Sequence, residues 1–106
     1  MAVDDRVIAE IIERVLRVTA PERIILFGSA AAGEMGPDSD IDLLILEAAL
    51  HDPREKSVKI RKELRGLGYP FDIIVMSSAQ FEESKDIIGG ISHPANKYGK
   101  VIYEAA

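Results

Sequence analysis

The sequence predicts a small α/β (α+β) domain, in which helices pack on a mixed β-sheet of three to four strands. Three observations lead to this fold class. Short apolar runs alternate with stretches of helical periodicity, turn-forming Gly, Pro and Ser residues separate them, and no repeat or linker divides the 106 residues. A chain of this length is expected to form one domain, so residues 1–106 are treated as a single unit.

The first half of the chain predicts a helix, a strand, a short helix and a second strand. Apolar residues recur at helical spacing over 3–19, and Pro21 ends that helix. The apolar run 23–27 indicates a buried strand, and residues 29–33 can form one or two helical turns. After a Gly-Pro turn, residues 40–47 are expected to form the second strand.

The next helix has a clear predicted beginning. Asp52 suits the N-cap, Pro53 the first helical position and Glu55 the third, a combination that stabilises a helix N-terminus. The helix is expected to end at Leu64 or Arg65, because two glycines follow.

The remaining chain predicts a third strand over 69–76, in which Tyr69 is expected to be a packing residue. Ser77 and Gln80 have the spacing of a capping box, so another helix should begin just after Ser77. The last part of the chain is ambiguous and can end in a short strand over 101–103.

Composition excludes several classes of function. The net charge is −5, with 13 Lys and Arg against 18 Asp and Glu, so direct non-specific nucleic-acid binding is not expected. The absence of cysteine rules out disulfides and thiolate chemistry and is consistent with a cytoplasmic location. The N-terminal stretch is charged throughout, unlike a signal peptide, and no apolar run approaches the roughly 20 residues of a membrane span.

Two carboxylates stand where the second strand begins. Side chains alternate along a strand, so Asp40 and Asp42 share one face, with their Cα atoms about 6.5 Å apart. Oxygen ligands without histidine or cysteine nearby favour Mg²⁺, with Mn²⁺ as the second choice. The structural alternative is an Asp-x-Asp sequence that only forms a turn and a cap.

The corner Gly28-Ser29 offers the complementary half of a site. A strand that turns directly into a helix exposes backbone N–H groups, and glycine lets a phosphate come close. The alternative is a simple turn. Taken together with Asp40 and Asp42, the corner favours a ligand that combines phosphate and Mg²⁺.

These motifs resemble those of a known family. The segment 28–33, "GS-x3-G", followed by "SDIDLLI", is similar to the minimal nucleotidyltransferases of the DNA polymerase β-like superfamily. The resemblance extends over most of the chain. "FDIIV", residues 71–75, is similar to the strand that carries a third carboxylate in that family, which nominates Asp72.

The resemblance implies a nucleotidyltransferase fold and a metal-dependent transfer of a nucleoside monophosphate from ATP or another NTP. It implies that Asp40 and Asp42 bind two Mg²⁺ ions, that Asp72 completes the metal site and helps deprotonate an acceptor hydroxyl, and that Gly28 and Ser29 hold the terminal phosphates. The hydroxyl attacks the α-phosphate in line and pyrophosphate leaves.

This sequence departs from the family at one point. Relatives often carry an arginine after Gly-Ser, whereas residues 30–32 are all alanine and no Lys or Arg occurs between Arg23 and Arg54. Positive charge must then come from metal, backbone N–H groups or a basic helix. The cations of that helix, interpreted as a solvated face with a substrate clamp as the alternative, are Arg54, Lys56, Lys59, Arg61, Lys62 and Arg65.

Small members of this family look like the antitoxin half of a two-gene pair whose partner is a helical HEPN-domain toxin, an RNase. The resemblance implies that such a chain attaches AMP to a tyrosine of the toxin. The alternative is a degenerate, catalytically weak or inactive module that neutralises its partner by binding alone. The sequence leaves the choice of NTP and the oligomeric state open, a homo-oligomer included.

Overall fold

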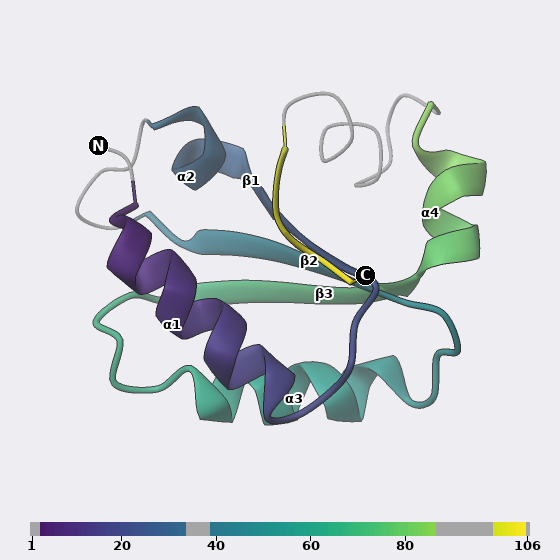
Figure 1. Ribbon diagram of the computed structural model, residues 1–106, viewed down its shortest axis with the longest axis horizontal. Coiled ribbons are helices and arrows are strands. Elements are labelled where there is room, and N and C mark those ends of the chain that lie inside the picture. The colour runs from purple at the N-terminus through teal and green to yellow at the C-terminus, as the bar shows by residue number, and fades with distance from the viewer. Residues whose placement is uncertain (1–2, 34–38, 87–98, 106) are drawn as a thin grey trace.

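The computed structural model describes residues 3–33, 39–86 and 99–105, which form a four-stranded mixed sheet with helices packed on it (Figure 1). The elements in chain order are α1 (Asp5–Leu16), β1 (Arg23–Phe27), α2 (Gly28–Ala32), β2 (Ile41–Glu47), α3 (Pro53–Glu63), β3 (Phe71–Ser77), α4 (Ser78–Ser84) and β4 (Lys100–Glu104). The strand order is β3-β2-β1-β4. The predicted fold class is confirmed.

Among the strand pairs formed by the described residues, one is parallel and two are antiparallel. β1 pairs antiparallel with both β2 and β4, whereas β2 and β3 are parallel, with Ile41 opposite Phe71 and Glu47 opposite Ser77. A parallel pair needs a crossover connection, and α3 supplies it. β2 and β3 therefore begin at the same edge of the sheet.

The core has two layers, one on each face of the sheet. α1 and α3 cover one face, where Ile11 and Ile60 pack with Leu43 and other strand residues. On the opposite face, Phe81 of α4 packs with Leu44 and its neighbours. β2 is buried on both faces, which explains its nearly continuous apolar sequence. α4 follows β3 directly and lies at the far end of the sheet from the start of β2 (Figure 1).

The predicted caps of α3 and α4 are confirmed. The Asp52 side chain accepts a hydrogen bond from the Glu55 backbone N–H at 3.1 Å, and the Ser77 hydroxyl accepts one from the Gln80 N–H at 3.1 Å. Asp52 has a φ of +43°, in the left-handed region that a short polar side chain tolerates.

Other boundaries differ from the expectation. α1 is shorter at both ends than the predicted 3–19, and β3 begins at Phe71 rather than at 69. Tyr69 is 37% exposed, so its prediction as a packing residue is wrong. The predicted final strand is present as β4, while the Gly-Pro turn lies outside the described residues. No helix in the described ranges is both long enough and apolar enough to cross a membrane.

A buried carboxylate joins three segments at the far end of β2. Glu47 is only 4% exposed, and its Oε1 accepts hydrogen bonds from the Thr19 hydroxyl and from Lys56 Nζ, the latter at 2.9 Å. The contact ties the segment after α1 and the first turns of α3 to the end of β2. The other carboxylate oxygen, Oε2, is buried with no hydrogen-bond partner among the described residues.

We expect Lys56→Ala to lower the free energy of unfolding by about 1–3 kcal/mol, because it leaves the buried Glu47 carboxylate without its cation. The matched control is Lys59→Ala on the same helix, whose exposed pair with Glu55 should contribute about 0.5 kcal/mol or less. Urea unfolding of both variants measures the difference. Equal destabilisation by the two substitutions would contradict the role given to Glu47.

Candidate active site

Three strand ends meet at one edge of the sheet and bring the predicted site residues together. In the parallel pair Asp42 lies directly opposite Asp72, and in the antiparallel pair Asp42 lies opposite Phe27, the last residue of β1. Neighbouring strands are about 4.8 Å apart, so these backbones are in close proximity. Asp40 stands immediately before β2, and Gly28 follows Phe27.

The three aspartates differ in their burial. Asp42 is partly buried, whereas Asp40 and Asp72 are exposed. The predicted alternation along β3 is confirmed, since Ile73 belongs to the core on the side of α1 and α3, with Phe71 packed against it. Asp72 therefore points to the other face, the one that α4 covers only at its far end.

Gly28 is required next to Asp42 for two reasons. Its φ is +69°, a conformation that L side chains rarely adopt. A Cβ at this position would also overlap Oδ2 of Asp42 and lie 3.2 Å from its Cγ. Ser29 is the second residue of the short helix α2, and its backbone position directly follows this close contact.

Of the three aspartates, Asp42 has a pKa that its surroundings shift. Burial raises the pKa of the Asp42 carboxyl above its ordinary value, and the neighbouring charges of Asp72 and Asp40 raise it further. A bound cation would relieve this repulsion. The structure thus concentrates negative charge at one point of the sheet, and none of the ion pairs among the described residues supplies a basic side chain to Asp40, Asp42 or Asp72.

The donor atoms of this edge fit a hard divalent cation. They are carboxylate oxygens only, the ligands that Mg²⁺ and Mn²⁺ prefer. As the side chains stand, no group of three or more His, Cys, Asp or Glu residues within the described ranges is arranged to hold a metal ion. The backbone positions suit a shared ion, and the exposed Asp40 and Asp72 side chains would have to turn toward Asp42 to bind it.

A groove of about 620 Å³ opens beside the cluster. Asp40 and Asp72 line it together with Arg61 and Arg65 from the end of α3, and Tyr69 lies in the turn that leads back to β3. Both arginines belong to the basic helix that the sequence analysis interpreted as a solvated face, with a substrate clamp as the alternative. They are exposed, and they also line this groove.

The edge of carboxylates, the glycine corner and the mixed sheet together define a nucleotidyltransferase fold. Residues 7–91 match the nucleotidyltransferase domain family, and the chain belongs to that family. The resemblance seen in the sequence is thereby confirmed. No curated protein matches the chain.

Solved structures similar to this fold include toxin–antitoxin complexes. A toxin–antitoxin structure with AMP-PNP superposes with a TM-score of 0.72 at 20% identity, covering 92% of this chain and 73% of that one. The complex of a tri-AMPylated Shewanella oneidensis HEPN toxin with an MNT antitoxin superposes with a TM-score of 0.64 at 19% identity, covering 95% of this chain and 72% of that one. A candidate nucleotidyltransferase from Sulfolobus solfataricus superposes with a TM-score of 0.62 at 20% identity, covering 93% of this chain and 78% of that one.

Gly28→Ala should destabilise the fold by roughly 2–4 kcal/mol, because it combines an unfavourable φ with overlap of the Asp42 carboxylate. Gly33→Ala is the matched control. Its φ of +73° is nearly the same, but no atom lies within 4 Å of the added Cβ, so the cost should be about 1 kcal/mol. Thermal unfolding compares the two. A control variant as unstable as Gly28→Ala would show that backbone strain alone accounts for the effect.

Asp42→Asn should raise the melting temperature by roughly 1–4 °C at pH 7 in EDTA, since it removes a repelled, partly buried charge. The raised folded-state pKa means that ionisation of Asp42 opposes folding. This cost is absent below the unfolded-state pKa of about 4 and is complete above the folded-state pKa. The advantage of the variant should therefore shrink as the pH falls toward 4. A variant less stable than wild type at pH 7, or an advantage that does not change with pH, would contradict the assignment.

Proposed function

We propose that this chain is a Mg²⁺-dependent nucleotidyltransferase that moves a nucleoside monophosphate, AMP as first choice, from an NTP to an acceptor hydroxyl. The observation that supports this most directly is the register that sets Asp42 opposite Asp72, beside the Gly28 corner. In this proposal Asp40 and Asp42 hold two metal ions, for which Mn²⁺ can substitute, and Asp72 holds one of them.

Each residue of the site would have a separate role in the proposed reaction. Gly28 lets the terminal phosphates approach the backbone closely, and Ser29 adds a hydroxyl. When bound, two metal ions neutralise the triphosphate and stabilise the attacking and leaving oxygens. The acceptor oxygen forms a bond to the α-phosphorus while the bond to pyrophosphate breaks, and Asp72 takes the acceptor proton. Asp40 and Asp42 would position the α-phosphate for in-line attack only through the cations that they would hold, because carboxylates alone repel a phosphate.

We further propose that the chain acts in the cytoplasm as an antitoxin whose acceptor is a tyrosine of a HEPN-type toxin. The similar structures support this choice of partner. One of them contains an AMPylated HEPN toxin together with an MNT antitoxin, and another is a toxin–antitoxin structure with a nucleotide analogue.

A second function has one observation in its favour. The helix α2 reads GSAAA and contains no basic residue, so this segment offers the triphosphate no side-chain cation. A degenerate module that neutralises its partner by contact alone would not need one. Catalysis and contact differ in their dependence on the carboxylates, which allows them to be separated by experiment.

Asp72→Asn should preserve most of the Mg²⁺–ATP affinity and lower transfer to a co-purified HEPN partner by roughly 10²–10⁴-fold, because it removes the base beside the acceptor. The control is Glu104→Gln, an exposed carboxylate on β4 at the other edge of the sheet. Calorimetry measures nucleotide binding with Mg²⁺ and with EDTA. Mass spectrometry of the partner after incubation with ATP, CTP, GTP or UTP measures transfer.

Three outcomes discriminate the proposals. Undiminished transfer by Asp72→Asn would remove this residue from the mechanism. Equal nucleotide binding with Mg²⁺ and EDTA would contradict the metal site. Wild-type protein that binds the partner but modifies it with no nucleotide would favour the contact-only antitoxin.

A further inference from the structure

The in-line geometry of the proposed reaction determines from which side of the carboxylates the acceptor hydroxyl approaches. In the proposed function, on which this inference rests, pyrophosphate leaves on the Gly28 side of the carboxylates. An in-line displacement brings the nucleophile in from the opposite side. Across the strand order β1, β2, β3, that opposite side is the one of Asp72. The groove lined by Asp72, Arg61 and Arg65 lies there.

The two arginines of this groove take part in none of the ion pairs formed among the described residues. Both side chains are exposed. Lys56 and Lys59 of the same helix, in contrast, are paired with glutamates. In a chain of net charge −5, two unpaired cations that face the acidic edge call for an anionic ligand.

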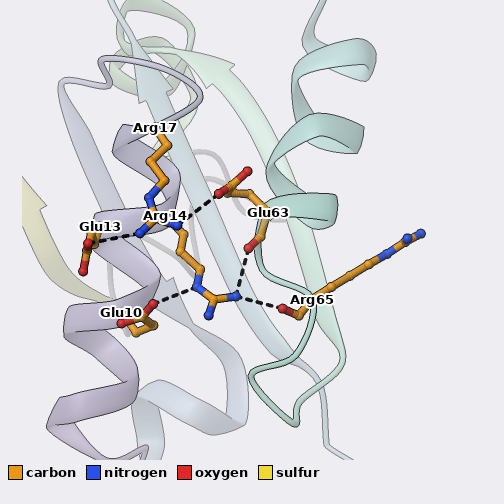
Figure 2. Close-up of polar contacts among 6 residues, drawn as sticks. All are labelled: Glu10, Glu13, Arg14, Arg17, Glu63 and Arg65. Carbon is orange, nitrogen blue, oxygen red and sulfur yellow. Dashed lines mark hydrogen bonds and ion pairs between the residues drawn. The ribbon is translucent and has the colours of Figure 1, made fainter.

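The backbone that carries these arginines is held in place from outside the groove. The Arg14 guanidinium of α1 donates to the backbone carbonyls of Glu63 and Arg65 at 3.1 and 2.8 Å (Figure 2). Its Nε also donates to Glu10 at 2.8 Å. In Figure 2 the Arg65 side chain extends away from this cluster of contacts. The end of α3 is therefore fixed, while the Arg65 guanidinium remains available to a ligand.

We propose that Arg61 and Arg65 are acceptor-specificity residues, and that the groove receives a segment of the partner protein with acidic side chains beside its acceptor hydroxyl. Asp40 and Asp72 alone would repel such a segment. The planar guanidinium groups offset this repulsion and pair with carboxylates through two hydrogen bonds each. Tyr69 and Pro70 add an apolar wall against which the acceptor side chain packs.

The test uses three fluorescent peptides in which one tyrosine is flanked by glutamates, glutamines or lysines. Fluorescence anisotropy with Mg²⁺ and AMP-PNP, and without nucleotide, reports binding independently of transfer. Wild type should prefer the glutamate peptide over the lysine peptide by roughly tenfold or more, and Arg61→Ala and Arg65→Ala should each reduce that preference by about 3- to 10-fold. Lys62→Ala is the matched control, an exposed cation of α3 that does not line the groove.

Calorimetry with Mg²⁺ and AMP-PNP runs beside the peptide assay and should give the same affinity for wild type and all three variants. A lower nucleotide affinity of the arginine variants would overturn the proposal by assigning the arginines to the triphosphate. Equal binding of the three peptides would overturn it, as would tighter binding of a single-stranded oligonucleotide than of the glutamate peptide. Failure of wild type to bind AMP-PNP, with the glutamate preference intact, would refute the transferase and leave the acidic-segment assignment standing.

Discussion

The parallel pairing of β2 with β3 is the constraint on which the site depends. It makes both strands begin at the same edge of the sheet, so Asp42 and Asp72 lie side by side. An antiparallel pairing would place Asp72 at the opposite end, and a register shift of one residue would turn its side chain into the core. α3 makes the parallel connection, and its C-terminal end contributes the arginines of the groove.

The Asp42 carboxylate destabilises the fold, although the proposed function requires it. Leu44 and Leu46, which follow Asp42 on the same face of β2, are fully buried, whereas Asp42 is partly buried among like charges. Such a residue weakens the fold unless a cation neutralises it, and it persists in native proteins where chemistry requires it. Gly28 is coupled to the same carboxylate, because only a residue without a Cβ fits beside it.

Local patterns predicted most of the elements, since caps and periodicity act over a few residues. The Asp52 and Ser77 caps and the alternation around Asp72 are examples that the structure confirms. The sequence could not predict the tertiary contacts. The pairing of Asp42 with Asp72 and the closeness of Arg61 to the carboxylates depend on how α3 returns the chain to the sheet. The prediction for Tyr69 was wrong because an aromatic residue beside an apolar run usually packs in the core. In the structure Tyr69 is exposed, and its sequence neighbours alone could not show this.

The most direct test of a shared metal site is a crystal structure with Mn²⁺ and AMP-PNP, in which anomalous scattering locates the ions. We expect Mn²⁺ at coordination distance from carboxylate oxygens of both Asp40 and Asp42, an ion at Asp72, and the terminal phosphates of the nucleotide at the backbone of Gly28. Anomalous peaks confined to other carboxylates, or a nucleotide bound at the Asp40–Asp42 edge with no ion between them, would contradict it.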